Sequence, residues 1–539
     1  MLPDPSARPI DHRPPSAADE LLEAARGARG RGDLDAAART LLQALELDAG
    51  SLAARNELAV VLLALGRPEQ ALQLLRWVLK RDPDLAPAHT NCGIAWQATG
   101  RPDEALASFR RAAALEPDSA SARNNLALCL RRLDRHDEAE TELRRALGLA
   151  PGDPWTLTNL GVLLRDLGRP AEARALLEPP LARHPDAVDL RCALAAALQD
   201  LGDLGAARAH YDAALAVQPG SGTARLGRGM LRLSCAEFGP AWDDYEGRFD
   251  ADETPRRGLP FPAWDGGGFA GRSVLVYAEQ GLGDEIMFAG CLPDLVAEAA
   301  RVTVECDPRL APLFARSFPA AAVFGAPRAA AQDWLDRVGA IDVQVAAGSL
   351  PRRYRRAVRD FPAHTGYTGY LRADPGRVSH YRDRLAALGP GRKVGLAWRG
   401  GLARTRRAVR SIEPELLAPL LARTDLQFVS LQHGDVGDDL ARMRAAAGRA
   451  PADWPEVPAD PDEAAALVTA LDATITVCSS VAHLGGALGA RVLVMAPATP
   501  EWRYLRSGDR LPWYPAVELV RQERPGDWSP VIGRVGPRV

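Results

Sequence analysis

Lysine is almost absent from this sequence of 539 residues, since it occurs only at positions 80 and 393. Arginine therefore supplies nearly all of the positive charge, and the formal net charge of −3 gives no overall attraction to nucleic acid or to an anionic membrane. The seven cysteines form no CxxC pair, and their odd number disfavours a disulfide framework. No apolar run reaches the roughly 18–20 residues that cross a bilayer. We expect a cytoplasmic protein with reduced, buried thiols.

The composition is ordinary for a globular protein of several domains, with 47% hydrophobic and 25% charged residues. Residues 1–16, MLPDPSARPIDHRPPS, contain no apolar core of the kind found in signal peptides. They are rich in proline and charge, which predicts a disordered lead.

A period of 34 residues runs from Ala17 to about Thr254. Each unit predicts a helix, a turn with glycine, a second helix and a proline stop, and the constant alanine suits a close helix crossing. The pattern resembles the tetratricopeptide repeat and predicts an all-α solenoid over residues 17–254. Alanine recurs at positions 37, 71, 105, 139, 173, 207 and 241, glycine at 32, 66, 100, 168 and 202, and proline at 83, 117, 151, 185 and 219.

Three asparagines, Asn91, Asn125 and Asn159, share one phase of this repeat on successive first helices. Such a ladder of amides can donate to and accept from the backbone of an extended peptide. The alternative is that these polar side chains simply face solvent. The ladder resembles the asparagine-lined groove of the nucleocytoplasmic O-GlcNAc transferase, which implies an acceptor protein or peptide as a partner of the repeats.

The second half alternates short strands with helices and follows a linker rich in proline and glycine, residues 255–272. This alternation predicts α/β architecture with parallel sheets, in an N-terminal Rossmann-like lobe, 273–372, and a C-terminal lobe, 373–539. Ligands of such folds bind at the carboxyl ends of strands, here between the lobes. Strands are predicted at Ser273–Ala278, Arg301–Cys306, Ala320–Phe324, Ile341–Val345, Lys393–Trp398, Gln427–Leu431, Ala473–Val477 and Arg491–Met495.

The first of these strands runs into the stretch EQGLGDEI, residues 279–286. Gly281 and Gly283 permit a tight turn with the backbone close to a ligand. Asp284 is then placed to act as a general base that removes a proton from an acceptor hydroxyl. The alternative is that Asp284 merely caps the following helix.

Two further strand ends carry polar residues that suit a phosphate. Residues 395–412 bring five arginines to one loop, and guanidinium groups match phosphate oxygens in bidentate fashion. Residues 475–489 place hydroxyls and His483 at a helix start, where backbone N–H groups favour anions. The alternatives are a solvated basic loop and a structural histidine. Nucleic acid is disfavoured because aromatic residues are not interleaved with the arginines. The five arginines are Arg399, Arg404, Arg406, Arg407 and Arg410.

Together these three stretches resemble the GT-B glycosyltransferases, and in particular the ADP-heptose:lipopolysaccharide heptosyltransferases. In that family a GD turn after the first strand supplies the catalytic aspartate, which corresponds to Asp284. Bacterial proteins that join tetratricopeptide repeats to such a lobe pair, some of which glycosylate flagellin, are similar in "RSI", "SLQHGD", "PEWRYL" and "PGDW". Cys478 and Ser479 stand where the family has Asp-Thr, and its phosphate-binding lysine has no clear counterpart.

The resemblance implies a metal-independent and inverting glycosyltransferase whose co-substrate is a nucleotide sugar, with no other cofactor. Two alternatives stay open: a transferase for glycan or lipopolysaccharide acceptors, and a non-catalytic repeat scaffold with a degenerate GT-B region. The implied donor-binding residues are Trp398, Arg399, Gly400, Arg404, Arg410, Ser411, Gln432, Ser479, Ser480 and His483, and the implied acceptor-binding residues are Gly281, Gly283 and Glu285 beside Asn91, Asn125 and Asn159.

Overall fold

The computed structural model describes residues 16–251, 256–327, 333–362, 369–401 and 407–539. The chain divides into two compact units, of which the first ends at Leu163 and the second runs from Leu164 to Val539. The boundary falls inside helix α9, so the second unit contains the last part of the repeat array as well as all of the strands. Within the described ranges, no helix combines the length and the apolar character needed to span a bilayer.

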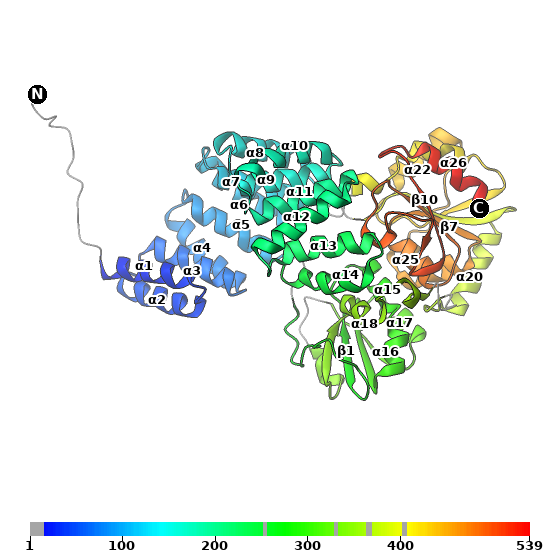
Figure 1. Ribbon diagram of the computed structural model, residues 1–539, viewed down its shortest axis with the longest axis horizontal. Coiled ribbons are helices and arrows are strands. Elements are labelled where there is room, and N and C mark those ends of the chain that lie inside the picture. The colour runs from blue at the N-terminus through cyan, green and yellow to red at the C-terminus, as the bar shows by residue number, and fades with distance from the viewer. Residues whose placement is uncertain (1–15, 252–255, 328–332, 363–368, 402–406) are drawn as a thin grey trace, which may run out of the picture. The chain divides into compact units, whose positions relative to one another are not determined.

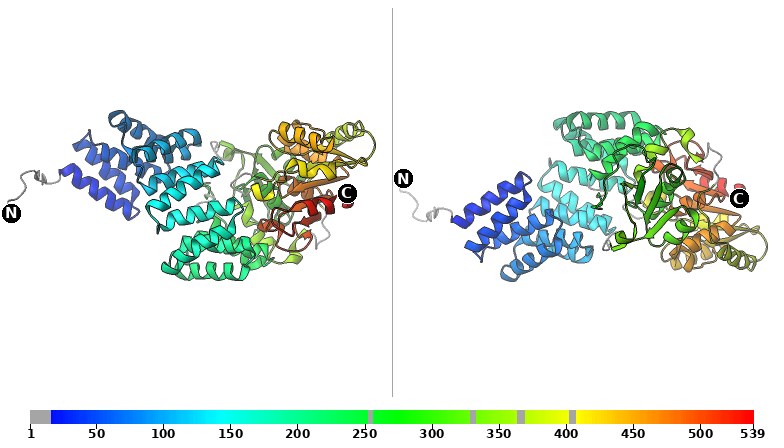
Figure 2. Two further views of the ribbon diagram at one scale, coloured as in Figure 1. Left: turned by 90° about the horizontal axis from the view of Figure 1, so that it is seen from above. Right: turned by 90° about the horizontal axis from the view of Figure 1, so that it is seen from below.

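Residues 17–245 form successive pairs of helices, as the 34-residue period predicts. The helices of the first unit lie pairwise side by side, coloured blue to cyan in Figures 1 and 2. The helices are α1 Ala17–Gly30, α2 Leu34–Leu47, α3 Leu52–Ala64, α4 Pro68–Arg81, α5 Ala86–Ala98, α6 Pro102–Leu115, α7 Ala120–Arg132, α8 His136–Leu149, α9 Pro154–Asp166, α10 Pro170–Arg183, α11 Val188–Leu201, α12 Leu204–Val217, α13 Gly222–Ser234 and α14 Phe238–Tyr245.

The turn inside each pair uses a left-handed backbone conformation at the same phase of the repeat. The glycines at this phase have φ between 71° and 88°. Two repeats lack the glycine, and there Asp134 (φ 61°) and Ala236 (φ 60°) adopt the same conformation. The repeat therefore keeps its turn without glycine. Aspartate tolerates this conformation better than alanine does, so the strain falls mainly on Ala236. The glycines are Gly32, Gly66, Gly100, Gly168 and Gly202.

Replacing Ala236 with Gly is expected to stabilise the protein. A side chain in the left-handed region destabilises the folded state by about 1–2 kcal/mol. Glycine also gives the unfolded chain more conformational freedom, which offsets about 0.4–1 kcal/mol of the stabilisation gained. We expect a net increase of about 0.5–1 kcal/mol in the free energy of unfolding, measured by urea denaturation. The reciprocal control is Gly202→Ala at the equivalent turn, which should destabilise. If Ala236→Gly were less stable than the wild type, Ala236 would not be strained in this turn.

The strands form two sheets, both in the second unit. The first sheet has the order β3-β2-β1-β4 and is parallel, and the second has the order β6-β5-β7-β8-β10-β9, in which only β9 pairs antiparallel. The strands are β1 Ser273–Tyr277, β2 Arg301–Cys306, β3 Ala321–Gly325, β4 Val343–Ala346, β5 Arg392–Ala397, β6 Leu426–Ser430, β7 Ala473–Val477, β8 Val492–Ala496, β9 Arg510–Leu511 and β10 Tyr514–Arg521.

Helices connect these strands, as parallel pairing requires. Their bounds are α15 Leu282–Ala289, α16 Leu292–Glu298, α17 Ala311–Ser317, α18 Pro351–Tyr354, α20 Pro375–Ala386, α21 Ala418–Leu421, α22 Gly437–Ala447, α23 Glu456–Ala459, α24 Pro461–Ala470, α25 Ser480–Ala487 and α26 Ser529–Val535. Figure 1 shows β1 among α15, α16 and α17, and β7 and β10 near α25. The α/β character of residues 273–539 is thus confirmed.

All eight predicted strands are present within two residues of their predicted ends, whereas β9 and β10 were not predicted. Pro515 lies inside β10 and lowers the strand signal of that run. The described part of the linker, from Arg256, is not a free tether. Ala263 forms a bridge with Gln344 of β4, and the Gln344 side chain donates to the carbonyl of Phe261 at 2.7 Å.

The last helix pair shares a hydrophobic core with both sheets of the second unit. Trp242 of α14 is 1% exposed, and its ring meets those of Trp502 and Trp513 edge-on, with centroids 5.7 and 6.1 Å apart. Its indole N–H donates to the carbonyl of Arg355 at 2.8 Å. The change of sequence texture near residue 254 is therefore not a boundary of the folded core.

Candidate active site between the two sheets

The candidate site begins where β1 ends and α15 starts. Gly281 occupies the N-cap position of α15 with an extended backbone, φ −69°. A Cβ on Gly283 would lie 3.3 Å from a ring carbon of His483 and 3.4 Å from Cα of Ser480. Glycine at position 283 therefore lets α15 approach the start of α25 closely. The atoms that approach Gly283 in this structure thus belong to α25, where the sequence predicted a ligand.

Asp284 does not cap the helix. It occupies the third position of α15, and the N-cap is Gly281. Its carboxylate is 18% exposed and accepts from Arg503, whose Nε lies 2.6 Å from Oδ1 and whose Nη2 contacts the same oxygen. Arg503 comes from the short helix η8, Trp502–Tyr504, after β8. Asp284 therefore points from the first sheet's domain toward the second.

Arg503 belongs to a row of alternating charges. Glu501 lies 3.7 Å from Nη1 of Arg503 and 2.8 Å from Nη1 of Arg410. Arg410 ends the short helix η6, Arg407–Arg410, and is 7% exposed. The nearby charges hold the pKa of Arg503 above its usual range although burial acts against it. The row Arg410, Glu501, Arg503, Asp284 joins the predicted base to two cations, of which Arg410 is buried and Arg503 is half-buried.

His483 is buried near this row, and each of its ring nitrogens lies within hydrogen-bond distance of a tyrosine hydroxyl. Its Nδ1 lies 3.1 Å from the hydroxyl of Tyr514, and its Nε2 lies 3.3 Å from the hydroxyl of Tyr504. Burial, followed by the charges of Arg503 and Arg410, lowers the pKa of His483 to about 3. The imidazole is therefore neutral at neutral pH. A direct bond from His483 to a phosphate requires one tyrosine to give way.

The predicted donor residues of the loop after β5 are brought together by Gln432. Its side-chain oxygen accepts the backbone N–H groups of Trp398 at 3.0 Å and Arg399 at 2.7 Å. The Trp398 ring is fully buried and donates to Asp439 at 2.8 Å, while the Arg399 guanidinium donates to the carbonyl of Asp435. Trp398 and Gln432 thus fix the strand end from inside.

The remaining donor residues lie around the same strand ends. A Cβ on Gly400 would meet the carbonyl oxygen of Cys478 at 2.7 Å, so glycine is required there for the loop to approach β7. Ser411 donates to the carbonyl of Arg407 at 2.8 Å. Ser479 is the N-cap residue of α25. Ser480, the first residue of α25, lines the pocket described next. Arg404 and Arg406 lie outside the described residues.

A small apolar pocket, open to solvent, lies between α15 and the second sheet's domain. Leu282 and Ile286 line it from α15, and Ser480 and Val481 line it from the start of α25. His433, after β6, also lines it, and burial lowers the pKa of this histidine. The pocket therefore adjoins the turn that carries Asp284. Within the described residues, no cluster of His, Cys, Asp or Glu is arranged to hold a metal ion.

Glu285 points away from this pocket, into the first sheet's domain. It is 4% exposed and accepts the backbone N–H of Asp307 at 2.9 Å. It lines a second cavity with Glu305, which accepts the N–H of Ala278 at 2.8 Å. These contacts tie the ends of β1 and β2 together. The structure gives Glu285 a structural position and does not bring it to the predicted acceptor side.

The asparagine ladder is partly used within the repeats. Asn91 donates to the side chain of Asn56 at 2.9 Å, and Asn159 donates to that of Asn124 at 3.1 Å. Each bond joins residues 35 apart, one more than the repeat period, on successive first helices, α3 to α5 and α7 to α9. Asn125 is half-buried on α7 and makes no such bond within the described residues. The ladder is therefore present, and two of its amides also link neighbouring repeats.

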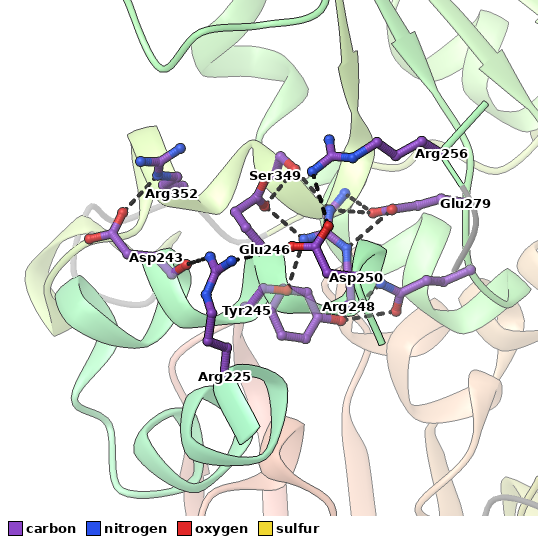
Figure 3. Close-up of polar contacts among 12 residues, drawn as sticks. Arg225, Asp243, Tyr245, Glu246, Arg248, Asp250, Arg256, Glu279, Ser349 and Arg352 are labelled. Carbon is purple, nitrogen blue, oxygen red and sulfur yellow. Dashed lines mark hydrogen bonds and ion pairs between the residues drawn. The ribbon is translucent and has the colours of Figure 1, made fainter. Parts of the chain in front are cut away.

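The turn after β1 is held by the last repeat through residues that the sequence did not single out. Figure 3 shows Arg248 of the short helix η1, Glu246–Phe249, facing Glu279 and Ser349. Arg248 is 2% exposed and donates to both oxygens of Glu279, at 3.1 and 2.9 Å. Burial raises the pKa of Glu279 despite this pairing. Tyr245 adds a hydrogen bond to Gln280 at 3.1 Å.

Comparison with known proteins supports the interpretation of the first half. Residues 28–90 and 135–198 match one family model described as a tetratricopeptide repeat, and residues 93–154 and 192–234 match another with the same description. The chain carries tetratricopeptide repeats. The predicted period is thus confirmed, and these matches lie within the helical part of the chain.

One curated relative extends further. Protein FlbA of Caulobacter vibrioides is 32% identical over 325 residues, which is 58% of this chain and 54% of that protein. The chain thus spans about half the length of this relative. Among solved structures, a thermophilic TPR protein of Thermus thermophilus is 26% identical with a TM-score of 0.31 and covers 34% of this chain and 99% of its own. PilF of Pseudomonas aeruginosa is 24% identical with a TM-score of 0.32 and covers 37% and 90%.

Proposed function

We propose that this protein is a glycosyltransferase of GT-B type, which transfers a sugar from a nucleotide-sugar donor to a protein acceptor held by the repeats. The observation that carries the proposal is the position of Asp284. It lies in the first turn of α15 at the carboxyl end of β1 and beside an apolar pocket, where it pairs with Arg503 and shares a row of alternating charges with Arg410. A carboxylate facing cationic groups across such a cleft suits the transfer of a group from a phosphate leaving group.

The proposed reaction is a direct displacement at the anomeric carbon. An acceptor hydroxyl gives its proton to Asp284 while its oxygen forms the new glycosidic bond. The bond from the anomeric carbon to the donor phosphate breaks, and its electron pair leaves with the nucleoside diphosphate. Arg410 stabilises the charge that develops on that leaving group. A single displacement inverts the configuration of the sugar and uses no covalent nucleophile.

The proposed acceptor is an intracellular protein, such as flagellin, with an extended segment along the repeats. Tetratricopeptide repeats present a long concave surface that suits such a segment. The amides of Asn91, Asn125 and Asn159 recur with the 34-residue period, and the proposal assigns them to this surface. The donor is proposed to enter between the two sheets, where the chain offers Arg410, Ser480 and the apolar pocket.

The experiment that tests the function is a comparison of intact protein masses in cells with and without this gene. If the proposal holds, at least one abundant protein loses mass by one or more sugar residues when the gene is removed. Unchanged protein masses with an altered lipopolysaccharide would favour the glycan-acceptor alternative. Unchanged protein and glycan masses, with no donor hydrolysis by the purified chain, would leave a non-catalytic scaffold.

Asn125→Ala is expected to raise the Michaelis constant for the protein acceptor. One lost amide contact is worth about 0.5–1.5 kcal/mol, which corresponds to about a 2- to 10-fold weaker acceptor. Asn125 is the sharpest choice because it makes no inter-repeat bond within the described residues, whereas Asn91 and Asn159 do. Hydrolysis of the donor by water should stay unchanged, since it does not use the repeats. Equal kinetics for the variant and the wild type would argue against the ladder as the acceptor grip.

A further inference from the structure

Arg503 holds the predicted base through a single oxygen. Its Nε lies 2.6 Å from Oδ1 of Asp284, and its Nη2 contacts the same atom. Within the described residues, the second carboxylate oxygen, Oδ2, takes no hydrogen bond. A fork-to-fork pair would use both oxygens and would be the stronger arrangement. The observed pair therefore leaves one oxygen of Asp284 open while its charge is neutralised.

Within the described residues, the charges in the row of Asp284 balance one another. Arg410, Glu501, Arg503 and Asp284 alternate in sign and sum to zero, and His483 next to them is neutral. A diphosphate brings at least two negative charges into this cluster. Arg410 and Arg503 are each already paired with a carboxylate. Among the described residues of this row, an anion therefore gains an arginine when a carboxylate gives up part of that arginine.

The backbone around Arg503 is fixed, so its side chain is the part that can change partner. Leu505 has φ 55° and ψ 166°, a conformation that side chains rarely adopt and that persists only where the surroundings hold it. Arg521 supplies that hold by donating to the carbonyls of Tyr504 at 2.7 Å and Leu505 at 3.0 Å. The backbone N–H of Arg506 donates to the carbonyl of Ser234 on α13 at 2.9 Å.

We propose that Arg503 is shared between Asp284 and the donor diphosphate. In the free protein it holds Asp284, and when the donor binds it turns to the phosphate and leaves Asp284 free to accept the proton of the acceptor. Both N–H groups of Arg503 in this pair meet Oδ1, so that oxygen is occupied while the pair lasts. The transfer of Arg503 thus frees the whole carboxylate of Asp284 for the acceptor only when a donor is present. The inference rests on the proposed function and gives Arg503 two successive partners, first Asp284 and then the donor diphosphate.

The test is a thermodynamic cycle on anion binding by the full chain. Inorganic pyrophosphate, the group common to nucleoside diphosphates, is titrated calorimetrically into the wild type, Asp284→Asn, Arg503→Gln and the double variant, without divalent cations. Asp284→Asn should bind pyrophosphate about 5-fold tighter or more, because Arg503 no longer has a competing carboxylate. Arg503→Gln should bind it about 10-fold weaker or more. In the double variant the gain from Asp284→Asn should disappear.

The matched control is Asp462→Asn. Asp462 of α24 pairs with Arg316 of α17, so it also contributes to an ion pair between the domains of the two sheets, away from β1. Its loss should leave pyrophosphate affinity within about twofold of wild type, as expected for uncoupled sites. If Asp284→Asn and Asp462→Asn change the affinity equally, or if the gain persists without Arg503, the sharing of Arg503 is overturned.

Two further measurements keep the outcomes separate. Arg503→Lys retains the positive charge but loses the planar fork of the guanidinium. It should bind pyrophosphate more weakly than the wild type and more tightly than Arg503→Gln. It replaces the glutamine variant in the cycle if that variant does not fold. An active wild type whose Asp284→Asn variant shows unchanged pyrophosphate affinity overturns the sharing alone. A wild type that hydrolyses or transfers no sugar from a panel of nucleotide sugars overturns the proposed function, whereas the charge coupling is still read from the cycle.

Discussion

Replacing Asp284 with Asn is expected to lower the turnover of sugar transfer by on the order of 100-fold or more. Asparagine has nearly the same shape as aspartate but cannot accept the proton of the acceptor hydroxyl. The side chain is 18% exposed, and Asp284 does not cap α15, so the fold should tolerate the change. The measurement is the steady-state rate of transfer with donor and acceptor both saturating, together with the far-UV circular dichroism of the variant.

Asp462→Asn serves as the control here too, because it removes a carboxylate from another ion pair in the same unit. It should retain the wild-type turnover within about twofold, as for a change far from the reacting atoms. Near-normal turnover of Asp284→Asn would show that Asp284 is a structural partner of Arg503 and that the base lies elsewhere.

Replacing Trp242 with Ala is expected to destabilise the second unit by about 3–5 kcal/mol, the usual cost of deleting a large buried aromatic side chain. The ring is 1% exposed and packs against Trp502 and Trp513, while its N–H satisfies the carbonyl of Arg355. Deletion leaves a cavity and an unpaired carbonyl in a core that the last repeat shares with both sheets. Denaturant unfolding followed by tryptophan fluorescence and circular dichroism measures the loss.

Trp155→Ala is the matched control, since that ring lies on α9 and is 46% exposed. Its removal should change the free energy of unfolding by no more than about 0.5 kcal/mol, as for other surface positions. If Trp242→Ala were equally mild, or if it melted α13 and α14 while the sheets kept their wild-type midpoint, the last repeat would be a separate folding unit after all.

Much of the fold follows from local patterns in the sequence. The 34-residue period places the helix pairs, because each repeat places the same alanine at a close crossing and a turn residue at the same phase. The alternation of short apolar runs with helices places β1 to β8. Periodicity could not reveal β10, since Pro515 interrupts its run, nor could it place the boundary of the compact units. The attachment of the last repeat to the sheets depends on Trp242 packing against residues more than 250 positions away, which no local pattern encodes.

The candidate site divides in the same way. Strand-to-helix turns mark Asp284, Trp398 and Ser480 because the ends of parallel strands are where such side chains gather. Arg503 was missed, although the stretch PEWRYL that contains it was noted, because its partner Asp284 is 219 residues away. For His483, the sequence predicted the strand-to-helix turn correctly but not the environment of the side chain. Its hydrogen-bond partners, Tyr504 and Tyr514, come from later elements of the chain.

The shared core of the last repeats sets where this protein can be cut and rejoined. A chimaera that takes its repeats from another chain at residue 254 would carry foreign side chains in place of Trp242, Tyr245 and Arg248, and with them a foreign support for the turn before Asp284. A junction at residues 150–153, between α8 and α9, would exchange α1 to α8 as a cassette and leave the second unit whole. Recombination that exchanges repeats and leaves the second unit whole is therefore confined to the first four helix pairs.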